Sequence, residues 1–253
     1  MTFASLEPAI LVAENLERAG FPHGFATRAG GVSEGPYATA NFGKGDDAAR
    51  VAENVRRFAK GVGFEASELR QVTQVHGARV VEASALRDAA AREEADALVL
   101  RLESEGGARA IGVRVADCVP ILAGSRTRGV AAIHAGWRGV VSGVIGAALG
   151  ALNADDAIAA IGPCIGPCCF EVGADVAAQI ATACGEPRVI AHCHGDKAHV
   201  DLRLAVRAQL RTYGVAEVED VPGCTRCDAA RFFSYRRDGQ QSGRHLAAIA
   251  LRR

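Results

Sequence analysis

Residues 111–139 read IGVRVADCVPILAGSRTRGVAAIHAGWRG, and this stretch decides both the fold and the candidate site. Residues 111, 113 and 115 are apolar at period two, and residues 121–122 and 130–133 are typical of short buried strands. The link at 124–129, GSRTRG, is polar and suits a hairpin loop. The stretch therefore predicts adjacent strands that turn back on each other.

The ends of these two apolar runs carry Cys118 and His134. If the turn spans residues 124–128, residues whose numbers sum to 252 face each other, so Cys118 lies opposite His134 on one face of the sheet. A turn one residue longer would place the two side chains on opposite faces. Pro120 cannot donate a ladder hydrogen bond. The alternative prediction is therefore that residues 116–118 form an irregular segment at the edge, or lip, of the sheet.

Composition limits the classes of function that the chain can serve. The 253 residues, 49% of them hydrophobic, are sufficient for one globular domain over residues 1–253. The 29 basic and 29 acidic side chains cancel, which favours a small neutral or anionic substrate over nucleic acid. Without a basic leader or an apolar run of about 18 residues, we expect a cytoplasmic protein with no membrane partner. In that compartment the eight cysteines are expected to be free thiols.

Apolar periodicity outside the central stretch predicts a mixture of helices and strands. Helices are expected at 8–19, 48–62, 140–152, 174–184 and 200–213, and strands at 21–27, 69–75, 80–82, 95–100, 158–161, 232–237 and 246–251. The polar segment 89–94 is expected to be helix or loop. His76 follows the expected strand 69–75, so it is a third potential ligand at a strand end.

His76, Cys118 and His134 supply two imidazoles and one thiolate, which suit zinc with a fourth position left for water or substrate. Their separations of 42 and 16 residues match no short zinc motif, but each residue lies beside a glycine or proline break at a strand end. A competing interpretation uses Cys118 and His134 as a thiolate–imidazolium pair oriented by Asp117. The second imidazole, His76, favours the metal.

The remaining cysteines and histidines give weaker signals. Cys224-Thr-Arg-Cys227 has the CxxC spacing, but no second pair follows at the distance of a zinc ribbon. The triplet His-Cys-His at 192–194 is expected to be a loop, and Cys164, Cys168 and Cys169 are expected to pack tightly in a Gly-Pro loop. Backbone N–H groups at the start of the helix 140–152, with Arg138 beside them, could hold an anion.

With these motifs in view, the chain resembles the multicopper polyphenol oxidoreductase (laccase-domain) family. The resemblance extends over nearly the whole chain and rests on TRAGGVSEGPY at 27–37, NFG at 41–43, QVHG at 74–77, ADAL at 95–98, ADCVP at 116–120, HAGWRG at 134–139, IGPCIG at 161–166, FEVG at 170–173, SYRR at 234–237 and GR at 243–244. It implies a compact α/β fold with a mixed sheet and flanking helices, similar to cysteine-hydrolase-like toxins. The family's zinc ligands carry over onto His76, Cys118 and His134.

The resemblance also implies an activity, because members of the family are described as purine nucleoside phosphorylases with adenosine deaminase activity. We expect zinc-dependent phosphorolysis of adenosine, inosine and methylthioadenosine, with purine nucleoside and phosphate as the small-molecule partners. Arg28, Arg138 and Arg236 are candidates for contacts to phosphate or ribose, and Asn41 is grouped with them as substrate-binding.

Three other functions remain open from the sequence. A copper-dependent phenol oxidase would follow the older family name, but seven histidines with one His-x-His pair are few for a multicopper centre, although a single copper at the Cys/His site is possible. An amidase could edit a muropeptide precursor, since relatives include a peptidoglycan editing factor. A binding domain with structural zinc would need a fourth protein ligand.

Overall fold

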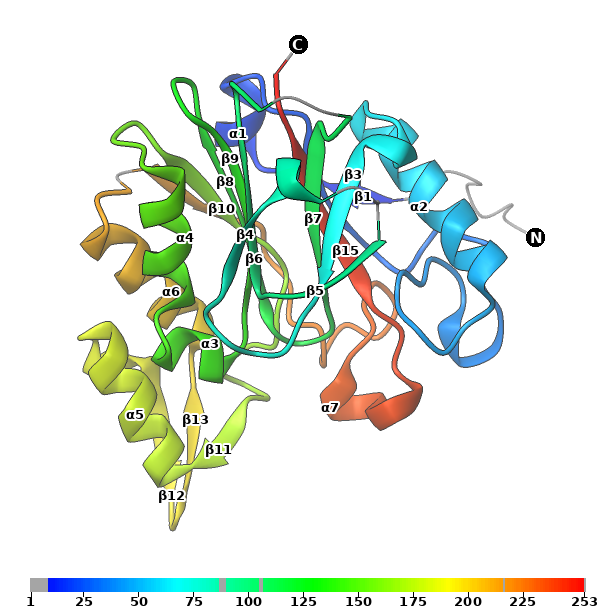
Figure 1. Cartoon of the computed structure of the whole chain (residues 1–253). Helices are drawn as coiled ribbons and strands as arrows, with labels where there is room; N and C mark the ends of the chain where they lie inside the picture. Colours follow the sequence, from blue (N-terminus) through cyan, green and yellow to red (C-terminus); the bar gives the residue numbers. More distant parts are fainter. Residues whose placement is uncertain (1–8, 87–89, 105–106, 216, 253) are drawn as a thin grey trace.

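The computed structural model describes residues 9–86, 90–104, 107–215 and 217–252, and in them two six-stranded sheets pack against each other (Figure 1). The first sheet has the order β1 (Ile10–Leu11), β2 (His23–Ala26), β15 (His245–Ala250), β7 (Ala110–Val115), β3 (Leu69–Thr73), β5 (Ala90–Glu94). Its first four strands are antiparallel, whereas β3 runs parallel to both β7 and β5.

The second sheet has the order β14 (Glu217–Asp220), β10 (Ile158–Ile161), β8 (Val119–Ser125), β9 (Gly129–Ala135), β6 (Ala97–Arg101), β4 (Val80–Glu82). The pairs β14–β10 and β6–β4 are parallel and the others antiparallel. A three-stranded antiparallel sheet adds β11 (Glu171–Gly173), β13 (Lys197–Val200) and β12 (Ile190–His194). The expected mixed α/β class is confirmed, with two mixed sheets in place of one.

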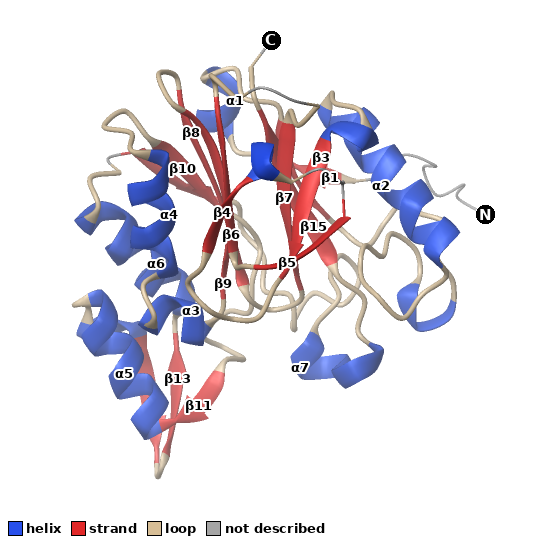
Figure 2. Cartoon of the chain, in the orientation of Figure 1, coloured by secondary structure: helices blue, strands red, loops and turns tan. Residues whose placement is uncertain are grey.

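Helices cover the outer faces of the two large sheets (Figures 1 and 2). Helices α3 (Trp137–Val141), α4 (Val144–Leu152), α5 (Ala174–Cys184) and α6 (Leu202–Thr212) share one buried cluster with the second sheet. Helix α2 (Ala48–Val62) forms a second buried cluster with the first sheet. A third cluster fills the space between the two large sheets. Short helices are α1 (Glu14–Arg18), α7 (Tyr235–Asp238) and 3-10 turns at Gly35–Tyr37, Ala66–Glu68, Ala83–Ala85, Pro187–Val189 and Gly239–Gln241.

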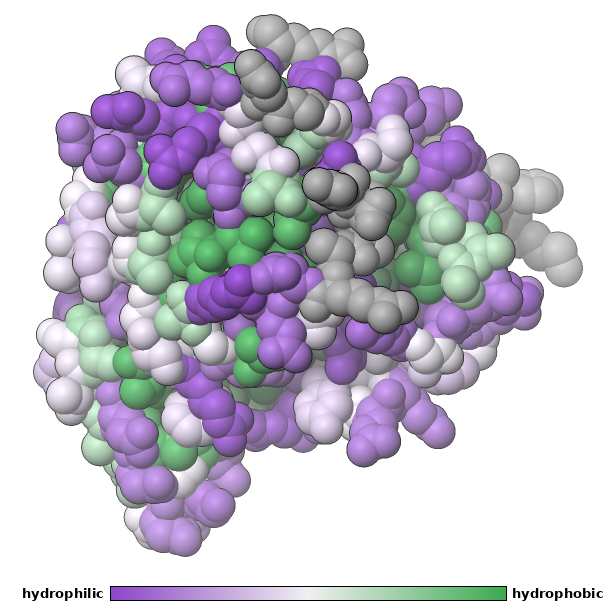
Figure 3. Space-filling view, in the orientation of Figure 1, coloured by the Kyte–Doolittle hydropathy of each residue, from purple (hydrophilic) through white to green (hydrophobic). Residues whose placement is uncertain are grey.

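The surface reflects this layered packing. Most of the face shown in Figure 3 is hydrophilic, and hydrophobic residues show mainly in a central band. No helix within the described ranges combines the length and the apolar character that a bilayer crossing requires. Apolar side chains are used chiefly inside, where burial of each large one stabilises the fold by roughly 1.5–3 kcal/mol.

Several expected elements coincide with the observed ones. The bounds of α2, α5, β4 and β10 are those predicted, and strand β15 lies within one residue of its prediction. Helix α2 begins where the Asp47 carboxylate accepts hydrogen bonds from two free backbone N–H groups, and it ends at Gly63 with φ 102°. These local signals are readable from sequence because they act within one turn of the helix.

Other expected elements were wrong. Residues 232–237 are not a strand: the Ser234 hydroxyl accepts from the Arg237 N–H and caps α7. Residues 90–94 form β5 and the triplet 192–194 lies in β12, not in loops. The helix expected over 140–152 is divided at Gly143, where φ is 80°. In the segment 8–19, β1 precedes a shorter α1; residues 8 and 89, at the edges of two expected segments, lie outside the described residues.

The pairing of β8 with β9 differs from the expected register by two residues. Paired residues sum to 254, so Pro120 faces His134 and Ser125 faces Gly129 across a turn at 126–128. A shift of two preserves the alternation of faces, so Cys118 and His134 still lie on the same side of the sheet. Cys118 precedes β8, and Asp117 before it has φ 88°, so the alternative of an irregular lip is the observed arrangement.

Candidate metal centre and cavity

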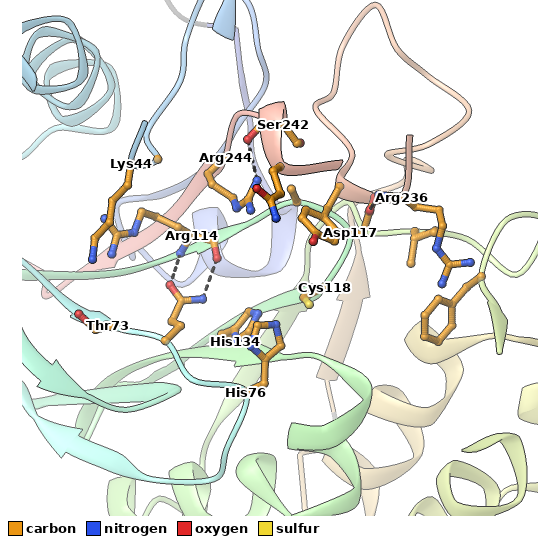
Figure 4. Close-up of a pocket in the computed structure, with 17 residues that line it drawn as sticks. Lys44, Thr73, His76, Arg114, Asp117, Cys118, His134, Arg236, Ser242 and Arg244 are labelled. Atoms are coloured by element: carbon orange, nitrogen blue, oxygen red, sulfur yellow. Dashed lines mark hydrogen bonds between the residues drawn. The ribbon is translucent and has the colours of Figure 1, made fainter. Parts of the chain in front are cut away.

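Three strand ends bring His76, Cys118 and His134 together (Figure 4). His134 belongs to β9, Cys118 lies just before β8, and His76 follows β3 with φ 62°. One ligand atom from each residue lies within 4.8 Å of the others, and the two imidazole centroids are 4.9 Å apart. The sequence prediction that these side chains converge therefore agrees with the geometry.

A buried carboxylate that the sequence analysis did not single out holds two of these residues. Asp96 is fully buried, and its Oδ1 lies 2.8 Å from Nδ1 of His134. The same carboxylate accepts backbone N–H bonds from His76 at 2.9 Å and Gly77 at 2.7 Å. Because Nδ1 of His134 is engaged, Nε2 is the ring nitrogen left for Cys118 or a metal ion.

The three side chains influence one another electrostatically. Burial alone would raise the pKa of the Cys118 thiol, but the His134 charge and hydrogen bonds from His134 and His76 lower this pKa to about 6. Burial likewise opposes protonation of His134, yet the Cys118 charge and the Asp96 hydrogen bond raise its pKa to about 9. At neutral pH the sulfur is thus a thiolate, which is the form that binds metal or attacks as a nucleophile.

The donor set fits a divalent transition-metal ion. Two imidazole nitrogens and one thiolate are borderline-soft donors, and three protein ligands leave one coordination position free. Gly136 leaves room for this arrangement, since an added Cβ would lie 3.1 Å from both the Cys118 sulfur and the His76 ring. The site opens into a cavity, because all three residues line it.

The cavity has a volume of about 570 Å³, which is within the size range of small-molecule sites. Besides the three ligands and Asp117, cationic, polar and largely apolar side chains line it. The cationic ones are Lys44, Arg114, Arg236 and Arg244; the polar ones are Thr73, Gln74, Gln240 and Ser242; the largely apolar ones are Ile165, Phe170 and Tyr235. In Figure 4, Lys44 and Arg114 lie to the left of the imidazoles, Arg244 lies above them and Arg236 lies to the right. The wall is therefore strongly cationic.

Two of the arginines are held in place by backbone groups. The side chain of Gln74 makes two hydrogen bonds to the backbone of Arg114, and Arg114 Nη2 donates to the Val72 carbonyl at 3.2 Å. Arg244 Nη1 donates to the Ser242 carbonyl at 2.7 Å. Burial and the nearby Arg244 charge lower the pKa of the Arg114 guanidinium. Two cations in the wall of one cavity favour the binding of an anion there.

Of the four residues expected to contact substrate, Arg236 lines the cavity. Arg28 instead donates to the carbonyls of Ala38 and Ala229 and lies over the Phe233 ring. Asn41 is fully buried and accepts from the N–H groups of Gly43 and Arg244, so it supports cavity residues from behind.

Arg138 is exposed beside Trp137, in a helix too short to provide the anion site expected at its start. It is not among the residues that line the cavity.

Asp117 lines the cavity but is not placed as the orienting acid of a Cys118–His134 pair. Its Oδ1 accepts from the Thr225 hydroxyl at 2.6 Å, and its Oδ2 accepts from the Arg236 backbone N–H at 2.6 Å. Asp96 takes the orienting position instead. Asp117 therefore ties the lip of the sheet to the C-terminal segment.

Sequence reasoning missed Asp96, Lys44, Arg114 and Arg244. Asp96 directly precedes an apolar run, and Arg114 is the charged residue inside the apolar alternation of β7, so a charge at a strand position was the available signal. Lys44 and Arg244 carried no such signal, since they meet the cavity only through long-range folding.

Comparisons with known proteins agree with this architecture. Residues 22–252 match the family described as multi-copper polyphenol oxidoreductase laccase. A purine nucleoside phosphorylase from Deinococcus radiodurans is 44% identical over 242 residues, covering 92% of this chain and 90% of the relative. The adenosine deaminase RL5 from an unknown prokaryotic organism is 37% identical, covering 81% and 83% of the two chains.

A solved structure extends the comparison to the fold. The crystal structure of YlmD from Geobacillus stearothermophilus superposes with a TM-score of 0.81 at 33% identity, covering 93% of each chain. The match to the family covers nearly all of the sequence that forms the two sheets and the cavity. The chain belongs to the multi-copper polyphenol oxidoreductase laccase family.

Proposed function

We propose that this protein is a zinc-dependent purine nucleoside phosphorylase that also deaminates adenosine. The observation that carries the proposal is the set of three ligand atoms within 4.8 Å of one another, opening into a cationic cavity of about 570 Å³. The names of the relatives supply the substrate class: one is a purine nucleoside phosphorylase and another an adenosine deaminase. Adenosine, inosine and methylthioadenosine are the proposed substrates.

Zinc is the proposed ion because two imidazoles, one thiolate and an open position form a common catalytic zinc set. When bound by His76, Cys118 and His134, it would supply Lewis-acid polarisation of an oxygen at the reacting centre. Asp96 would fix the orientation of His134 and the position of the His76 backbone. A single copper ion is the alternative occupant.

Phosphorolysis requires a phosphate held in line with the glycosidic bond. The new bond joins a phosphate oxygen to the ribose C1′, while the bond from C1′ to the purine nitrogen breaks. Lys44, Arg114 and Arg244 would hold the phosphate, since all three are cationic and line the cavity (Figure 4). Phe170 and Tyr235 offer aromatic surface for the base.

Deamination requires water in place of phosphate. Water adds to C6 of the purine and ammonia leaves, so a proton acceptor and donor must lie beside the base. Asp117 is the carboxylate among the described residues that line the cavity, and we assign it this role. Its hydrogen bonds to Thr225 and to the backbone of Arg236 hold the carboxylate in a fixed place.

The products formed from adenosine test the proposal. Purified protein is incubated with adenosine in the presence and absence of phosphate, and the products are separated by chromatography. Adenine with ribose-1-phosphate, formed when phosphate is present, supports phosphorolysis, and inosine supports deamination. Neither product in a zinc-loaded sample would refute the proposed function.

A second function is favoured by one specific observation, the chain of contacts from Asp96 through His134 to Cys118. This chain matches the order of acid, base and nucleophile in a cysteine hydrolase. It would suit an amidase acting on a muropeptide precursor, with Cys118 attacking the amide carbon. Release of a free amino acid from such a precursor, with no turnover of adenosine, would favour this second function.

We also infer a cytoplasmic location, with small molecules and not nucleic acid as partners. All eight cysteines are free, as expected where thiols stay reduced. Recovery of the native protein in the soluble cytoplasmic fraction of its cells, and not in exported material, tests this inference.

A further inference from the structure

A second group of potential metal ligands lies outside the His76–Cys118–His134 site. The thiols of Cys168, Cys169, Cys224 and Cys227 all lie within 4.8 Å of one another. They come from two loops, one after β10 and one after β14, which are more than 50 residues apart in the chain. The CxxC pair therefore does have partners, but these precede it in the sequence and are themselves adjacent.

We propose that these four cysteines bind a structural zinc ion. Zinc–thiolate bonds are about 2.3 Å long, so the sulfurs of a tetrahedral site lie about 3.8 Å apart. The sulfur of Cys168 is 3.6 Å from that of Cys224 and 3.5 Å from that of Cys227, and Cys169 is 3.2 Å from Cys227. These separations approach the tetrahedral value and are far longer than the roughly 2 Å of a disulfide bond.

The backbone fixes the two loops against each other at this cluster. Cys164 and Cys224 form an isolated parallel bridge, and the Thr225 N–H donates to the Cys164 carbonyl at 3.1 Å. The Gly166 N–H points to the Cys224 sulfur at 3.2 Å, as backbone amides do around metal-bound thiolates. An added Cβ at Gly166 would lie 3.3 Å from the Cys168 sulfur, so the glycine lets the backbone approach the cluster.

The charge and exposure of the cluster suit a closed site. Four thiolates around one zinc ion carry a net charge of −2, and Arg226 Nη1, 3.6 Å from the Cys169 sulfur, partly balances it. Cys168 and Cys227 are exposed whereas Cys169 is buried, so zinc can reach the four sulfurs from solvent. Four protein ligands leave no position for substrate, which is the mark of a structural zinc site.

The cluster is connected to the wall of the cavity. Thr225, between two of the proposed ligands, donates its hydroxyl to Asp117, and the Ile165 N–H donates to the Asp117 carbonyl at 2.9 Å. Ile165 and Phe170, which flank the loop of Cys168 and Cys169, line the cavity. A zinc ion here would hold this wall, and through Asp117 it would help to position Cys118.

Elemental analysis of the purified 253-residue chain counts the two sites separately. We expect two zinc ions per chain in the wild type, one in Cys118→Ala and one in Cys224→Ser. The matched control is Cys193→Ser, because Cys193 is exposed but lies outside the cluster, and it should keep both ions. An equal zinc count in the wild type and in Cys224→Ser would overturn the proposal, whatever the occupancy of the His76–Cys118–His134 site. The count does not depend on the reaction that the cavity catalyses.

Alkylation of the wild type tests the same site without a substitution that could disturb folding. Cys168, Cys193 and Cys227 are all exposed, so without a metal all three should react with iodoacetamide. We expect Cys193 to react at least tenfold faster than the other two in the zinc-loaded protein, and chelation to remove this difference. Equal reactivity before chelation, or a disulfide among the four cysteines found by mass spectrometry, would contradict the proposal.

Discussion

Nδ1 of His134 lies 2.8 Å from Oδ1 of Asp96, a side chain that is fully buried. The same carboxylate accepts from the backbone N–H groups of His76 and Gly77. One buried acid thus sets the ring orientation of His134 and holds the loop that carries His76. Because these residues come from three separate parts of the chain, the metal centre depends on the pairing of β6 with β9.

Asp96→Asn should weaken zinc binding at the His76–Cys118–His134 site by about 10- to 100-fold, because the amide loses the charge that orients His134. Competition with a chelating dye measures the affinity. Asp156→Asn is the matched control, since Asp156 accepts hydrogen bonds from the hydroxyls of Ser125 and Thr127 at the opposite end of β8. An unchanged zinc affinity in Asp96→Asn would show that the carboxylate does not support the ligand set.

Gly136→Ala should also reduce zinc affinity at this site, although the backbone there has φ −75° and tolerates alanine. The added Cβ would lie 3.1 Å from both the Cys118 sulfur and the His76 ring, so the ligands must move by a few tenths of an ångström. Gly150→Ala in α4 meets nothing within 4 Å and serves as the control. Equal zinc affinities in the two variants would contradict the predicted crowding.

Arg244→Met should raise the KM for phosphate at least tenfold and leave the KM for adenosine nearly unchanged, because Arg244 lies among the cations proposed to hold phosphate. Steady-state kinetics with each substrate varied in turn measures both values. Arg138→Met is the control, since Arg138 is exposed outside the cavity. A loss of phosphate affinity in Arg138→Met but not in Arg244→Met would reverse the assignment.

Stability should fall in mild acid because of His245, whose Nε2 accepts from the Phe233 N–H in a buried site. Burial lowers the pKa of His245 to about 3, and the charges of Arg28, Arg244 and Arg237 act in the same direction. The unfolded chain therefore binds the proton first. The contribution of neutral His245 to the free energy of unfolding is fully present above about pH 6.5. It decreases by about 1.4 kcal/mol per pH unit as pH falls toward 3.

Urea unfolding at pH 7.5 and 5.5 measures this loss. His23, also buried with a lowered pKa, contributes in the same direction, so the wild type should lose at least about 1 kcal/mol between the two conditions. His245→Gln keeps an acceptor for the Phe233 N–H but cannot be protonated. If the free energy of unfolding changes less between the two pH values in His245→Gln than in the wild type, His245 is a source of the loss. An identical change in both proteins would exclude it.

The parts of this structure that sequence could predict are those set by short-range chemistry. Helix α2 was predicted from its own apolar periodicity, and the convergence of Cys118 with His134 followed from strand alternation. The register itself was two residues off, since turn length is not fixed by composition. Residues 232–237 were expected to form a strand because the cap at Ser234 was not recognised. In the structure Ser234 caps α7.

The parts that escaped prediction depend on contacts between distant segments. Asp96 reaches His134 only because β6 pairs with β9, and Lys44 and Arg244 meet at the cavity through separate loops. The CxxC at Cys224 was judged isolated because its partners precede it by more than 50 residues. The periodicity within one segment does not predict a contact with a distant segment, so these features could be seen only in the three-dimensional fold.

His76→Ala tests the central claim most directly, because it removes one proposed zinc ligand and leaves Cys118, His134 and Asp96 in place. Zinc content and adenosine turnover are measured on the same sample, with the wild type alongside. We predict one zinc ion fewer per chain and a loss of turnover of at least 100-fold. Turnover that persists after this ion is lost would show that Cys118 and His134 act without the metal, and would contradict a zinc-dependent reaction.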